Sequence, residues 1–137
     1  MSYRTLLIAA ALVLALAAPA RAAGPADYVR GAQNADGGFG MTQSGGSEPF
    51  ATGWALLGLA AAGQKPGQAA LAYLRRGIGS VRAIGDIQRT ILVLRLAGEN
   101  PRRFGGRNLL GDMLKHRRSD GSFGGYVYYT VRKRDVE

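Results

Sequence analysis

Three aspartates and one histidine are the residues of this chain that could carry chemistry. Asp36 and Asp120 each stand in an Asp-Gly-x-Phe-Gly segment, and Asp86 precedes an apolar segment. His116, the only histidine, lies in a basic helical segment, which indicates a solvated position. The chain has no cysteine, which excludes thiol nucleophiles, disulfides and thiolate zinc sites. Asp86 is expected to be the N-cap of the following helix, although that place would also let it face a cavity.

The two Asp-Gly segments predict turns of the same kind. Aspartate accepts hydrogen bonds from nearby backbone N–H groups, and glycine supplies the positive φ that ends a helix. The two aspartates lie 84 residues apart (36 to 120) and have the same neighbours. We therefore expect structural turns, each with its phenylalanine packed between the helices that it joins. The expected turn residues are Gln33, Asp36, Gly37, Gly38 and Phe39 in the first copy, and Asp120, Gly121, Phe123 and Gly124 in the second.

The two ends of the chain differ from its middle. Residues 1–22 combine a basic start, an apolar run over residues 6–19 and a small-x-small site, which is typical of a cleaved secretory signal peptide. Residues 131–137 form a charged tail, and the formal net charge is +9. We therefore expect a secreted or extracytoplasmic protein that touches the membrane through its signal peptide alone. We expect no nucleic-acid partner, because an exported protein meets little nucleic acid. Contact of the late arginines with an anionic surface stays open.

The middle of the chain predicts an all-α fold of alternating helices. Helices are expected over residues 26–34, 50–62, 68–76, 87–97 and 108–117, with 77–85 irregular and a further helix starting at 126–129. The segments 50–62 and 87–97 are apolar on nearly all sides, which indicates buried helices. Both end in Ala-Gly-x-x-Pro, 35 residues apart (63 to 98), so a helical-hairpin repeat near 40 residues is expected. The expected inner-helix core residues are Trp54, Leu57, Ile91 and Leu94.

The first turn and the helix after it resemble a known group of proteins. Residues 33–40 resemble the Gln-x-x-Asp-Gly turn of the terpene-cyclase and protein-prenyltransferase α/α toroid superfamily, related to the QW motif of squalene cyclases and typical of the prenyltransferase/squalene oxidase repeat. The resemblance implies inner and outer helices arranged as part of a toroid over residues 23–130. It also implies that Gln33 links an outer helix to the next element and that Phe39 packs beneath it. About two and a half hairpins are present, so the chain resembles a truncated member that cannot close a ring.

The resemblance says little about chemistry, because the catalytic signatures of the enzymes are absent. No Asp-x-Asp-Asp-like acid occurs, and the Asp, Cys, His zinc site of the prenyltransferases lacks its cysteine. We therefore expect a non-catalytic repeat module without metal or cofactor that binds a hydrophobic or surface ligand or a protein partner. The alternative is a fragment of a terpene-cyclase-like enzyme whose acid lies in missing repeats. Two and a half hairpins leave apolar faces uncovered, so self-association is also expected.

Overall fold

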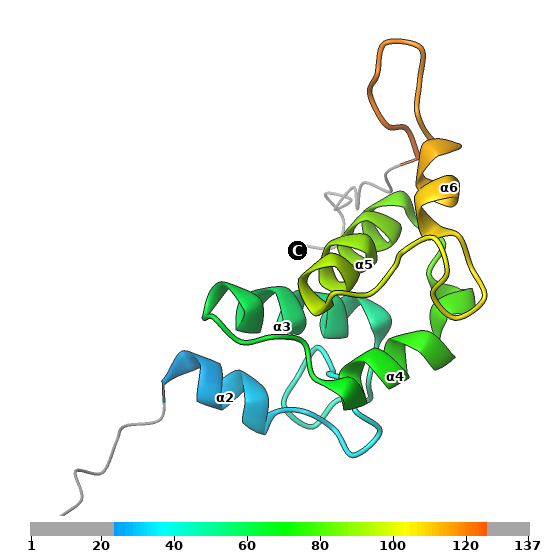
Figure 1. Cartoon of the computed structure of the whole chain (residues 1–137). Helices are drawn as coiled ribbons and strands as arrows, with labels where there is room; N and C mark the ends of the chain where they lie inside the picture. The colour runs from blue at the N-terminus through cyan, green and yellow to red at the C-terminus, as the bar shows by residue number, and fades with distance from the viewer. Residues whose placement is uncertain (1–23, 126–137) are drawn as a thin grey trace, which may run out of the picture.

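The computed structural model describes residues 24–125, and these residues form five α-helices, one 3₁₀ helix and no strand (Figure 1). This confirms the all-α prediction. The predicted signal peptide at 1–22, the helix start at 126–129 and the tail at 131–137 lie outside the described residues. In chain order, the helices are α2 (Pro25–Gly31), α3 (Pro49–Ala61), α4 (Gln68–Arg76), the 3₁₀ helix η1 (Ile78–Ser80), α5 (Ile84–Ala97) and α6 (Leu109–Leu114).

Three helix boundaries differ from the sequence prediction by three residues each, and the other differences are of one residue. Helix α2 ends three residues before the predicted 34, where Ala32 and Gln33 donate instead to carbonyls three residues back. Helix α6 ends at Leu114, because the N–H groups of His116 and Arg117 likewise close i to i−3 turns. Helix α5 begins before Asp86, since the carbonyl of Ala83 already accepts from Asp86 N and Ile87 N at 3.0 Å each. Local turns therefore shorten two helices and lengthen one.

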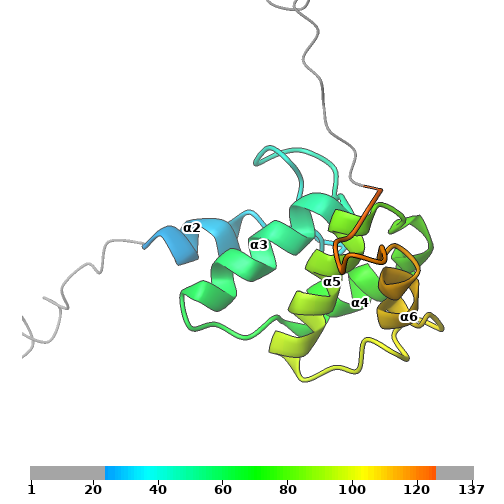
Figure 2. The ribbon, with the colours of Figure 1, turned by 90° about the horizontal axis from the view of Figure 1, so that it is seen from above.

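Helices α3 and α5 lie side by side at the centre of the described chain and run in the same general direction (Figures 1 and 2). Figure 2 shows α2 beside α3 on the side away from α5, and α6 on the far side of α5. Helix α4 packs against α3. Among the described residues, no helix has the length and apolar character needed to cross a membrane. The fully buried core side chains come from α3, α4, α5, α6 and the loops between them: Leu56, Leu71, Leu74, Val81, Ile84, Val93, Leu94, Phe104 and Leu109.

The ends of α3 and α5 have the same backbone geometry. Gly63 and Gly98 have φ values of 79° and 80°. At the first end, Gln64 N donates to Leu59 O at 3.0 Å, and at the second, Glu99 N donates to Leu94 O at 2.8 Å. This is the six-to-one bond of a Schellman stop, which the left-handed glycine makes possible. The 35-residue repeat in sequence is thus also a repeat in local structure.

One core prediction is wrong: Trp54 is 55% exposed. Leu94 is fully buried, and Leu57 and Ile91 are half-buried against the core. Helix α3 is apolar on nearly all sides, but a helix buries only the sides that have neighbours. Its neighbours in the described chain are α2, α4 and α5, and they leave more than half of the Trp54 side chain exposed, although Arg89 of α5 stacks on its ring.

Candidate ligand-binding face

The first Asp-Gly turn is held by its own side chains. Asp36 Oδ1 accepts from Gly38 N at 2.9 Å and from the Ser47 hydroxyl at 2.6 Å. Gln33 Nε2 donates to Gly37 O at 2.8 Å, so Gln33 closes the turn itself. The Ser47 hydroxyl is engaged by Asp36, and Glu48 stands at the N-cap position of α3. These side chains tie the end of α2 to the start of α3.

The second turn repeats the backbone hydrogen bonds of the first turn and the bond from a backbone N–H to its aspartate. Asn34 N donates to Gly38 O at 2.9 Å, and the equivalent Arg118 N donates to Ser122 O at 2.8 Å. Gly37 and Gly121 have φ values of 88° and 86°. Asp120 Oδ1 accepts from Ser122 N at 2.9 Å, as Asp36 does from Gly38 N. The phenylalanines differ, since Phe39 is buried in the core while Phe123 is half-buried and Gly124 beside it is also half-buried.

The two turn aspartates are ionised hydrogen-bond acceptors. The hydroxyl of Ser47, and then the N–H of Gly38, lower the pKa of Asp36 below its ordinary value of 3.8. The hydroxyl and then the N–H of Ser122 lower the pKa of Asp120 in the same way. A general acid needs the opposite shift, because it must hold its proton near neutral pH. Both carboxylates therefore serve the turns.

Asp86 is not the N-cap of α5, contrary to the sequence prediction. It is the third residue of the helix, and Ala83 stands at the N-cap position. Because α5 starts earlier than predicted, the Asp86 side chain lies one turn from Arg89 and accepts from its Nη1 at 2.6 Å. The carboxylate is thereby committed to an ion pair on the α3 side of α5.

Arg89 is a residue whose role the sequence does not reveal. Its guanidinium carbon lies 4.5 Å from the centroid of the Phe50 ring and 4.7 Å from that of Trp54. The side chain is only 11% exposed, and its Nε is buried without a hydrogen-bond partner in the described chain. Two aromatic faces and Asp86 compensate the buried cation in place of that bond. The sequence signal that could have found it is an arginine within the mostly apolar segment 87–97.

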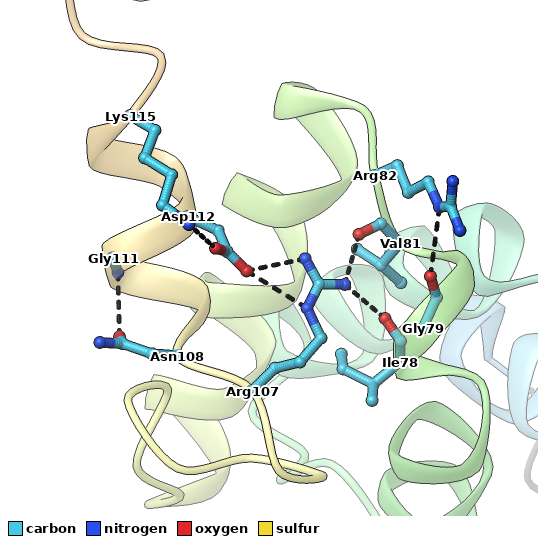
Figure 3. A network of polar contacts seen from close by, with 9 residues as sticks. All are labelled: Ile78, Gly79, Val81, Arg82, Arg107, Asn108, Gly111, Asp112 and Lys115. Atoms are coloured by element: carbon cyan, nitrogen blue, oxygen red, sulfur yellow. Dashed lines mark hydrogen bonds and ion pairs between the residues drawn. The ribbon is translucent and has the colours of Figure 1, made fainter.

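Arg107 plays a comparable role at the middle turn, where no Asp-Gly motif occurs (Figure 3). Its Nη1 donates to Ile78 O at 2.6 Å and to Val81 O at 2.7 Å. Its Nε and Nη2 donate to Asp112 Oδ2 at 3.2 and 2.8 Å. The guanidinium thus joins η1 to α6 and donates to carbonyls that a turn carboxylate, which only accepts hydrogen bonds, could not satisfy.

The exposed apolar side of α3 and α5 is the strongest candidate for a binding site. We call it the inner face, made of Phe50, Leu57, Leu92 and Leu96. Phe50 is 40% exposed, Leu92 55% and Leu96 48%. A hollow of about 340 Å³ adjoins Phe50 at one end, where Glu48 and Asp86 also line it. Another of about 230 Å³ adjoins Leu96 at the other end. An extended apolar surface with hollows at its two ends suits a ligand that lies along both helices.

Comparison of the chain with protein-family models, curated proteins and solved structures finds no match. The described residues hold no group of three or more His, Asp or Glu side chains placed to bind a metal ion.

Proposed function

We propose that this protein is an exported, non-catalytic repeat module related to the α/α toroid superfamily, and that it binds a hydrophobic ligand on the inner face. The observation that carries the proposal is the exposure of Phe50, Leu92 and Leu96 on two adjacent helices. Removing apolar surface from water contributes about 25 cal/mol per Å², so such a face favours an apolar occupant.

The architecture of the described residues supports the repeat part of the proposal. Helices α3 and α5 run alongside each other and end in matching stops, as two inner helices of consecutive hairpins would. The two Asp-Gly turns share their hydrogen bonds and glycine conformations. The internal repeat of the turn motif is therefore present in backbone geometry as well as in sequence.

The proposal is tested with N-phenyl-1-naphthylamine, an uncharged apolar dye whose emission rises on leaving water. An uncharged probe is needed because the chain has a net charge of +9, so an anionic dye would bind to any basic part of its surface. Leu92→Gln and Leu96→Gln should each weaken binding several-fold. Leu114→Gln is the matched control, since Leu114 is 47% exposed on α6 and off the inner face. Equal dye binding by all three variants would refute the inner face as the site.

A further inference from the structure

A further hollow lies on the side of α3 opposite the inner face. Leu59 follows Phe50 by nine residues (50 to 59), and at about 100° per residue this separation places the two side chains on opposite sides of the helix. In the view of Figure 1, α2, the link from α3 to α4, and α4 all lie below α3, whereas α5 lies above it. The hollow has a volume of about 160 Å³. We call it the outer pocket, and its described lining includes Arg30, Phe39, Leu56, Leu59, Lys65 and Gly67.

The floor of the outer pocket is apolar. It is formed by Phe39, Leu56 and Leu59, which belong to the core and are 4%, 1% and 7% exposed. An apolar cavity of about 150 Å³ can hold a benzene molecule. The outer pocket, at about 160 Å³, therefore has room for an apolar group of about six carbon atoms.

The rim of the outer pocket is positively charged. Arg30 and Lys65 line it together with the amides of Gln33 and Gln64, and no carboxylate is among the described lining residues. Arg30 is paired with Asp27 through its Nη1 at 2.7 Å, which leaves its other N–H groups for a ligand. Lys65 has no ion-pair partner in the part of the chain that the structure describes. An anionic group at the rim would therefore meet an ammonium that no described carboxylate neutralises.

We propose that the outer pocket binds a small organic carboxylate, with the apolar group of the ligand on the floor and its carboxylate at Lys65 and Arg30. Lysine and arginine both donate charge-assisted hydrogen bonds to carboxylate oxygens. The floor excludes a purely inorganic anion, because apolar side chains cannot replace the hydrogen bonds that such an anion makes with water. The outer pocket is separate from the inner face, so this inference does not rest on the function proposed above.

Benzoate is the probe, and benzyl alcohol and inorganic phosphate are its controls. The full chain is used, and its mass shows whether residues 1–22 remain. Benzoate should shift the backbone amide NMR signals of Gln64, Lys65 and Gly67 in a saturable manner. Benzyl alcohol keeps the ring and phosphate keeps the charge, and each should bind about tenfold more weakly than benzoate. A wild type that binds benzoate no more tightly than either control overturns the proposal.

Gly67→Phe tests where the ligand binds. A Cβ at Gly67 meets no atom within 4 Å, and the φ of −75° suits any residue, so a phenyl ring can enter the outer pocket without backbone strain. This variant should lose saturable benzoate binding. Gly58→Phe is the matched control, because Gly58 is equally open and does not line the outer pocket. Benzoate binding that survives Gly67→Phe, or that Gly58→Phe also abolishes, would overturn the assignment.

Lys65→Gln tests the charge at the rim. It should weaken benzoate binding about fivefold or more, because one charge-assisted hydrogen bond is lost. Lys115→Gln removes the same charge from an exposed side chain at the end of α6, and it should leave the affinity unchanged. Equal affinities for benzoate in the two variants would show that only the net charge of the chain matters, and the proposal would fail. Lys65 also lines the hollow at Leu96, whereas Gly67 does not, so the two substitutions together separate the outer pocket from the inner face.

Discussion

The side chain of Arg89 crosses α3 directly over Gly53. A Cβ added at Gly53 would lie 2.7 Å from Arg89 Cδ and 3.1 Å from its Cγ. The missing side chain at Gly53 is what allows the guanidinium to reach the rings of Phe50 and Trp54. A glycine in the middle of a helix lowers helix stability, but here the missing Cβ allows two helices to approach each other closely.

Gly53→Ala and Gly58→Ala should therefore differ, although both replace a glycine in α3. Gly58→Ala should stabilise the fold by about 0.5–1 kcal/mol through helix propensity, since its Cβ meets nothing within 4 Å. Gly53→Ala gains the same propensity but displaces Arg89, whose stacking on aromatic rings is worth about 0.5–2 kcal/mol. Urea unfolding should place Gly53→Ala about 1–2 kcal/mol below Gly58→Ala. Equal stabilities would show that Arg89 moves aside without cost.

Trp54→Ala should lower the unfolding free energy by only about 1–2 kcal/mol, because the ring is half exposed and loses mainly its contact with Arg89. Leu94→Ala removes a fully buried side chain and should cost about 2–5 kcal/mol. Urea unfolding at low protein concentration, where self-association is weakest, would measure both losses. A larger loss for Trp54→Ala than for Leu94→Ala would contradict the exposed position of Trp54.

Gly37→Ala and Gly121→Ala form another matched pair. Both glycines have φ near +87°, a conformation that costs an L-residue about 1–2 kcal/mol. A Cβ at Gly37 would also lie 2.4 Å from the backbone oxygen of Ala69, whereas nothing lies within 4 Å of one at Gly121. We expect Gly121→Ala to cost about 1–2 kcal/mol and Gly37→Ala more than about 3 kcal/mol. Thermal melts of both variants decide this, and similar melting temperatures would contradict the close contact at Ala69.

Arg107→Ala should lower stability by about 2–3 kcal/mol, because it leaves the carbonyls of Ile78 and Val81 and the carboxylate of Asp112 without their donor. Arg107→Lys should recover only part of this, since one ammonium cannot reproduce the planar fork. Arg103→Ala is the control, an exposed arginine in the same loop. Urea unfolding that gave Arg107→Ala and Arg103→Ala equal losses would argue against the network of Figure 3.

The pKa values of the two turn aspartates predict how the stability of the fold changes at acid pH. Their pKa values are lower in the folded chain than 3.8, so the folded state favours the ionised carboxylates. That stabilisation is present above pH 3.8 and is lost as the pH falls through the folded pKa values. Asp36→Asn should keep the fold and reduce this loss of stability below about pH 4. Unfolding followed by circular dichroism from pH 7 to pH 2 measures this loss of stability. If Asp36→Asn and the wild type had the same pH profile, the Asp36 carboxylate would be excluded as the source of the loss.

The sequence alone determined the helical segments and the glycine turns and stops between them. Apolar periodicity predicted the segments that became α2 to α6, and the glycines at 37, 63, 98 and 121 all have positive φ. These features depend on residues close together in the chain, because helix periodicity and left-handed glycine stops are local properties. Helix α5 shows the limit, since its true start was set by the Ala83 carbonyl and changed the role of Asp86 from cap to ion-pair partner.

Only the tertiary structure decided which apolar side chains are buried and which cations are held inside. Trp54 and Leu94 both lie on segments that were expected to be buried, yet one is 55% exposed and the other fully buried. The difference comes from the neighbours that each helix side meets, and a single segment does not contain that information. Arg89 and Arg107 likewise find their aromatic and carbonyl partners on elements up to 39 residues away (50 to 89). Such contacts depend on the positions of helices in space, which local sequence patterns do not specify.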